Sequence, residues 1–189
     1  MRRVLIAGLA TLAAAGGAQA AELRLGAVAH DLGWNAGAGG KEQGAAVQAE
    51  LVGAALPLPA WTGRPRPSLS ASLNTAGDTS YVAANLIWRA PLGGRVFGEA
   101  TLGYAVHDGE IALSANPADP GRIRTDRERI IFGSRDLFRL NLQVGLALSD
   151  RLDAALVLEH LSHGQILAAG RNEGLDSIGL RLGYRFGGE

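Results

Sequence analysis

The sequence contains no cysteine, few aromatic residues and no excess of charge of either sign. Because no disulfide can form, the chain depends for its stability on the fold itself. Its 18 basic residues balance its 18 acidic residues, so the chain has no strong overall field that would attract nucleic acid. A nucleic-acid partner is therefore not expected.

Long hydrophobic runs are also lacking after the first twenty residues. Those twenty are typical of a signal peptide: Arg2 and Arg3 precede an apolar core, and Ala18-Gln19-Ala20 is a small-residue cleavage site. Beyond them, no stretch approaches the ~20 apolar residues of a transmembrane helix, whereas a transmembrane β-strand needs only ~9–11 alternating residues. We expect residues 1–20 to be removed and residues 21–189 to form one domain, for which a membrane barrel stays possible.

Apolar and polar residues alternate with a period of two along most of the remaining chain. The plainest case is segment 67–74, in which three apolar residues alternate with Ser and Asn. The segments with this pattern are residues 22–30, 45–54, 67–74, 80–90, 95–107, 137–149, 152–162 and 176–186. Helical periodicity of useful length is absent between them. The pattern predicts an all-β protein, an eight-stranded antiparallel barrel.

The connections between these segments differ in length. Those over residues 31–44, 107–136 and 163–175 are long, and those over residues 91–94 and 149–151 are tight turns. Such alternation is typical of an outer-membrane barrel with short periplasmic turns and longer external loops. Two connections depart from it, because residues 55–66 form a long one where a turn is expected and residues 75–79 a short one.

Alternation alone does not orient a closed sheet, and a soluble lipid carrier would place the apolar side chains inside. The polar positions favour a membrane barrel, because they are rich in small and amide residues that suit a crowded lumen. Charged residues at these positions can pair there, Glu159 with Arg181 in particular; the set is Arg181, Arg185, Glu159, Glu99 and Glu50. Aromatic residues near strand ends are typical of a membrane-interface girdle, namely Trp88, Tyr104 and Tyr184.

Three polar residues lie on the apolar side of the last two strands. His160 and Ser162 continue the alternation of Leu158, and Asp176 has the parity of Ile178. Antiparallel neighbours bring these residues together on the outer wall, at one membrane boundary. Either the apolar face simply ends there, or the residues form a Ser-His-Asp site with nucleophile, base and orienting acid.

The residues around this cluster resemble a known family. "EHLSHG" (159–164), "NEGLDSIGLRLGYRF" (172–186) and "FGSRDLFRLNLQVGLALSDRLDAAL" (132–156) are similar to the C-terminal part of the PagL-type lipid A 3-O-deacylases. The resemblance implies an eight-stranded outer-membrane barrel whose Ser-His-acid site faces the outer leaflet. It also implies hydrolysis of the acyl ester at position 3 of lipid A, in lipopolysaccharide, without a cofactor or metal.

By this resemblance, His160 is the base, Ser162 the nucleophile and Asp176 the orienting acid. The family has Glu at the acid position, so the shorter Asp176 must sit closer to the histidine. It also commonly has Asn after the serine, at the oxyanion site, where this chain has His163. The side chain of His163, or backbone N–H groups as far as Gly164, are the expected oxyanion donors.

The longest external loop contains four arginines, Arg122, Arg124, Arg127 and Arg129. They either solvate the loop or bind the phosphates of lipid A. Non-enzymatic alternatives also stay open: a small adhesion or anchoring barrel whose polar cluster is incidental, and the soluble lipid carrier. The sequence leaves open whether the chain forms a homodimer.

Overall fold

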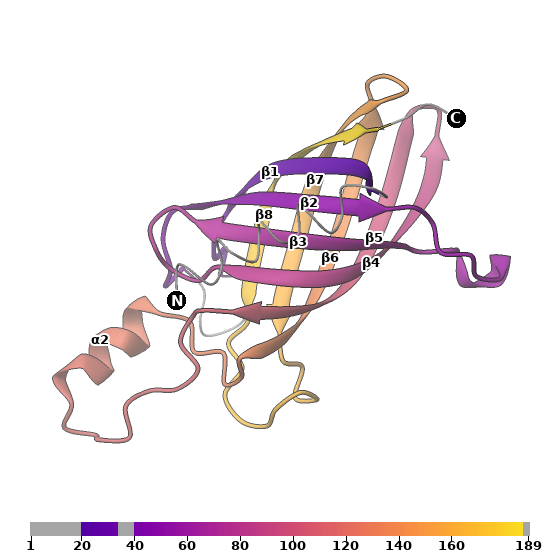
Figure 1. Cartoon of the computed structure of the whole chain (residues 1–189). Coiled ribbons are helices and arrows are strands. Elements are labelled where there is room, and N and C mark those ends of the chain that lie inside the picture. The colour runs from indigo at the N-terminus through magenta and orange to yellow at the C-terminus, as the bar shows by residue number, and fades with distance from the viewer. Residues whose placement is uncertain (1–19, 34–39, 187–189) are drawn as a thin grey trace.

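The computed structural model describes residues 20–33 and 40–186. Eight strands form a closed antiparallel barrel in sequence order (Figure 1), which confirms the predicted fold class. The strands are β1 (Ala20–Ala29), β2 (Ala45–Gly53), β3 (Arg66–Asn74), β4 (Tyr81–Gly93), β5 (Val96–His107), β6 (Asp136–Ala147), β7 (Leu152–Ser162) and β8 (Leu175–Arg185). The predicted signal peptide lies outside the described residues except for Ala20, the first residue of β1.

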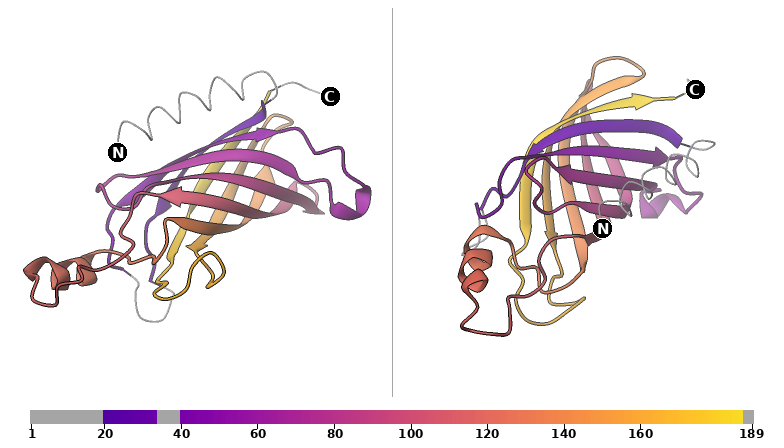
Figure 2. Two further views of the ribbon diagram at one scale, coloured as in Figure 1. Left: turned by 60° about the horizontal axis from the view of Figure 1, so that its bottom comes forward. Right: turned by 60° about the vertical axis from the view of Figure 1, so that its left-hand side comes forward.

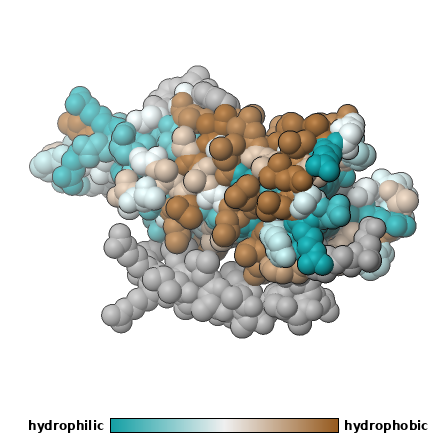
Figure 3. All heavy atoms as spheres, turned by 90° about the horizontal axis from the view of Figure 1, so that it is seen from above, coloured by the Kyte–Doolittle hydropathy of each residue, from teal (hydrophilic) through white to brown (hydrophobic). Residues whose placement is uncertain are grey.

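The apolar side chains point out of the barrel and the polar ones point in. Leu142 and Leu180 are 62% and 70% exposed, whereas Asn141 is 1% exposed and Arg181 4%. Hydrophobic side chains gather over the middle of the visible wall, between hydrophilic ends (Figure 3). This orientation is that of a membrane barrel, so the soluble lipid carrier, which needs the apolar side chains inside, is wrong.

Ion pairs fill the lumen. Arg24 Nη1 lies 2.7 Å from Glu99 Oε2, and Arg181 Nη1 lies 3.2 Å from Glu50 Oε2. The predicted pairing of Glu159 with Arg181 is wrong, because the carboxylate of Glu159 binds Arg139 instead, at 2.5 Å from Nη2. Alternation identifies which residues face the lumen, but partners across a small lumen also depend on strand stagger, which the sequence does not display.

The long connections that precede β2, β6 and β8 gather at one end of the barrel, and α2 (Pro120–Glu128) extends from that end (Figure 2). The sequence analysis did not predict this helix, because no helical periodicity marks it. The residues of α2 are strongly hydrophilic and none is buried, so the helix has no apolar stripe. Its start nevertheless has a local signal: Asp119 caps the helix through Gly121 N at 2.8 Å, and Pro120 follows at the first helical position. No helix among the described residues is long and apolar enough to cross a membrane.

A buried apolar cluster lies at the same end of the barrel. Ile130 and Phe132, from the connection between β5 and β6, pack with Leu137, Leu161 and Leu175 at the ends of the strands. All five side chains are at most 1% exposed. The cluster fixes the ends of β7 and β8, which are the elements that present the three polar side chains of the outer wall.

Candidate active site

Strand register brings the three predicted site residues together. His160 on β7 is directly opposite Asp176 on β8, and Ser162 lies two residues further along β7 on the same face. On the other side of β7, Ser162 is opposite Phe138 of β6. The structure therefore confirms that the three residues meet on the outer wall, at the end of the barrel that has the long loops.

The three side chains form a chain of hydrogen bonds. His160 Nδ1 lies 2.7 Å from Asp176 Oδ1, and His160 Nε2 lies 3.0 Å from Ser162 Oγ. A carboxylate only accepts hydrogen bonds, so Nδ1 carries the proton of the imidazole and donates a hydrogen bond to Asp176. Nε2 is then free to accept the proton of the Ser162 hydroxyl. The shorter acid is no obstacle, because Asp176 reaches the imidazole at full hydrogen-bond contact.

The site is partly open on the outside of the barrel. The side chain of His160 is 33% exposed, and that of Asp176 is 14% exposed. The outward-facing residues next to His160 along and across the sheet are apolar, Leu158 on β7 and Leu140 on β6. A hydrophobic substrate held in the membrane can therefore reach Ser162 without entering the lumen.

His163 is turned away from this site. Its side chain is buried, Nε2 lies 3.0 Å from the carbonyl oxygen of Arg171, and Nδ1 accepts from Gln165 N at 3.1 Å. Its backbone N–H donates to the Asn172 side chain at 3.2 Å. Neither group is placed to bind an oxyanion at Ser162. Gly164 follows in the left-handed conformation, with φ of 63°, and no hydrogen bond of the described residues uses its N–H.

The connection between β7 and β8 is held by Glu173, which the sequence analysis did not single out. Its carboxylate accepts from Lys41 Nζ at 2.9 Å, from the backbone N–H of Ile131 at 2.8 Å and from Arg171. Burial alone would raise the pKa of Glu173, but these donors outweigh burial and the pKa is lowered. Glu173 therefore stays ionised and links three external connections beside the site. A single Glu in a loop carries no sequence signal for such a role.

The four arginines of the longest loop have different surroundings. Arg129 is tied into the barrel mouth by Asp78 at 2.8 Å and Glu42 at 3.2 Å. Arg122 donates to the carbonyl oxygen of Ser114. Arg124 and Arg127 are exposed on α2 and make no ion pair with any described residue. Only this pair is available for a ligand without breaking an existing contact.

Fold and site together define a β-barrel of the outer-membrane type with Ser, His and Asp hydrogen-bonded on its outer wall. The sequence profile of the lipid A 3-O-deacylase (PagL) family matches residues 27–185. The chain belongs to this family, and it is an outer-membrane lipid A deacylase. Comparison with curated protein sequences gave no match.

Several solved chains share the fold. The crystal structure of the outer membrane enzyme PagL is similar with a TM-score of 0.60 and 16% identity, over 88% of this chain and 100% of that one. The crystal structure of Neisserial surface protein A (NspA) is similar with a TM-score of 0.51 and 10% identity, over 87% and 96%. Neither the fold nor the family match supports the homodimer that the sequence left open.

Proposed function

We propose that the protein is a serine-type hydrolase that removes the acyl chain esterified at position 3 of lipid A. The observation that carries this proposal is the hydrogen-bonded order Asp176, His160, Ser162 on the lipid-facing wall. A serine with its base and an orienting carboxylate is the arrangement that activates a hydroxyl for attack on an ester. Its place outside the lumen suits a substrate whose acyl chains are in the outer leaflet.

The reaction follows from the roles of the three side chains. Ser162 Oγ attacks the ester carbonyl while His160 Nε2 takes its proton, and Asp176 stabilises the imidazolium that forms. Collapse of the tetrahedral intermediate breaks the bond to the sugar oxygen, which receives the proton from His160. The acyl chain is then on Ser162, and water activated by His160 releases it as a fatty acid. We assign the N–H of Gly164 to the oxyanion, because His163 and Asn172 bind each other.

The proposal is tested by mass spectrometry of lipid A from cells that express the wild type or Ser162→Ala. The expected result is the loss of one ester-linked acyl chain, from position 3, in wild-type cells only. Fragmentation of the glucosamine units assigns the position. Unchanged lipid A in cells whose barrel is folded in the outer membrane would favour the non-enzymatic barrel. Loss of the chain with both proteins would show that Ser162 is not the nucleophile.

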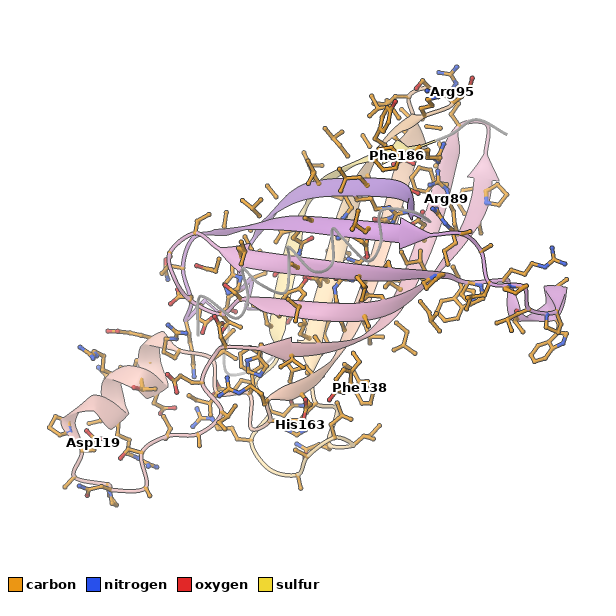
Figure 4. The ribbon with its side chains drawn as sticks, viewed as in Figure 1. Arg89, Arg95, Asp119, Phe138, His163 and Phe186 are labelled. Carbon is orange, nitrogen blue, oxygen red and sulfur yellow. The ribbon has the colours of Figure 1, made fainter. Side chains whose placement is uncertain are left out.

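We further propose that Arg124 and Arg127 bind lipid A phosphate. The double variant Arg124→Gln/Arg127→Gln is expected to raise KM for lipid A by about tenfold, because both arginines are exposed and each solvent-exposed ion pair contributes only about 0.2–1 kcal/mol. The KM for a short-chain nitrophenyl ester, which has no phosphate, should not change. The control is Arg95→Gln, at the opposite end of the barrel from Asp119, which caps α2 (Figure 4). An equal rise for both substrates would contradict the assignment.

A further inference from the structure

The long connection at the short-turn end of the barrel is an ordered segment that has no role in the candidate active site. Residues 54–65 join β2 to β3 and contain the single-turn helix η1 (Ala60–Thr62). Leu56 N donates to the Pro65 carbonyl at 3.0 Å, and Arg64 Nε donates to the Leu58 carbonyl at 3.2 Å. These internal hydrogen bonds give the connection a definite shape, and it projects sideways beyond the barrel wall (Figure 1).

The connection is docked on an outward-facing side chain. Trp88 has the same parity on β4 as Leu86, which is exposed, and its Nε1 donates to the Thr62 carbonyl at 2.9 Å. Gly63, with φ of 72°, passes so close that a Cβ there would lie 2.9 Å from Trp88 Cδ1. β3 begins opposite Ile87, whereas β4 continues to Gly93, so the connection occupies the side of β4 that has no strand partner. It therefore lies against the outer wall and not beneath the lumen.

The apolar surface of the barrel continues past the level of this docking contact. On β4 the outward position four residues beyond Trp88 is Leu92, which is 61% exposed, and Val96 faces outward at the start of β5. Tyr184 and Phe186 form an edge-to-face pair at the same end of the barrel, on the end of β8. A membrane barrel has its aromatic girdle at such a level, between hydrocarbon and headgroups.

The connection itself presents apolar side chains at this level. Trp61 is 87% exposed and Leu58 41% exposed. The guanidinium of Arg64 is held beside them by its bond to the Leu58 carbonyl, where a phosphate headgroup can bind it. An exposed tryptophan costs free energy in water but is favoured at a membrane interface, where the ring is buried and the indole N–H stays hydrated.

We infer that residues 54–65 form an interfacial anchor that inserts Trp61 and Leu58 into the phospholipid leaflet on the short-turn side of the barrel. The proposed anchor is on the opposite side of the membrane from Ser162 and does not depend on the proposed function. It explains why one connection at this end is long. Instead of extending into water, the connection widens the aromatic girdle that fixes the depth of the barrel in the bilayer.

The test uses tryptophan fluorescence of the folded barrel in phosphatidylcholine vesicles. The chain has three tryptophans, so the variant Trp34→Phe/Trp88→Phe leaves Trp61 alone. Subtracting the emission of Trp34→Phe/Trp61→Ala from that of Trp34→Phe gives the emission of Trp61 while the hydrogen bond of Trp88 to Thr62 is intact. In this intact pair, the two variants that keep Trp88, phosphatidylcholine brominated near the headgroup should quench most of the Trp61 emission. Aqueous acrylamide should quench little of it. Heat-modifiable electrophoretic mobility confirms that each variant is folded.

Two further measurements make the test sharp. In Trp34→Phe/Trp88→Phe the hydrogen bond to Thr62 is lost, so Trp61 should become more accessible to acrylamide than in the intact pair. Ile123→Trp in the Trp34→Phe/Trp61→Ala background adds an exposed tryptophan on α2 as the control, which acrylamide should quench and brominated lipid should not. Trp61 behaving like this control would overturn the inference. Quenching only by bromine near the chain ends would also overturn it, because the anchor is interfacial.

Discussion

Replacing Ser162 by alanine is expected to lower kcat/KM for lipid A deacylation by about 10³-fold or more, and His160→Ala should lower it by a similar factor. The two side chains are hydrogen-bonded at 3.0 Å and act in one proton transfer. The double variant should therefore be no worse than either single variant, because a serine hydroxyl without its base, or a base without its nucleophile, gives no activation. Rates are measured on purified lipid A in detergent with the folded barrel.

Asp176→Asn provides the internal control for this prediction. The amide keeps the shape of the side chain but removes the negative charge 2.7 Å from His160 Nδ1, and it can present its N–H to the imidazole. The rate should fall by less than for Ser162→Ala, with KM little changed, since only the transition state carries an imidazolium. If the losses of Ser162→Ala and His160→Ala multiplied in the double variant, the two residues would be acting independently, and the proposed mechanism would be wrong.

Much of the fold and the convergence of the site were predictable because both depend on one-dimensional alternation. Once β7 and β8 are antiparallel neighbours with a given connection, His160 and Asp176 share a face and meet across the register. The parity of Ser162 then follows from its distance of two residues along the same strand. Neither step requires knowledge of side-chain packing, so alternation alone is enough to place the three residues on one face of the barrel.

Features set by packing between distant segments could not be predicted in this way. The parity of His163 indicates that it faces away from Ser162. It does not indicate that the ring hydrogen-bonds to the Arg171 carbonyl or that the backbone N–H donates to the Asn172 side chain. Glu173 gains its role only when Lys41, from the connection between β1 and β2, is folded against it. The direction of residues 54–65 depends in the same way on a contact with Trp88, which lies on another strand.

Replacing Glu159 by alanine should lower the free energy of unfolding by about 3–5 kcal/mol, the largest stability effect that we expect from one substitution. Arg139 is 1% exposed and loses its closest counter-ion in this variant. Tyr81 and Gln48 also lose the acceptor that they share at 2.5 and 3.0 Å. A buried cation and two buried donors are then left with fewer partners in a lumen that has little room to rearrange.

The stability is measured by urea unfolding of the barrel in phospholipid vesicles, and Glu128→Ala on the surface of α2 serves as the control. Its side chain is exposed, so the expected change is within about 0.5 kcal/mol. The double variant Glu159→Gln/Arg139→Gln removes both charges and should be more stable than Glu159→Gln alone, because no cation is left buried without its anion. If Glu159→Ala unfolded like the wild type, water would have to replace the lost carboxylate, and the lumen could not be the closed ion-pair network that this structure has.

Glu159 is next to His160 in β7, so substitution of Glu159 also tests whether the lumen network holds the strand that presents the base. A fall in kcat for the still-folded Glu159→Gln, without a change in KM, would indicate that it does.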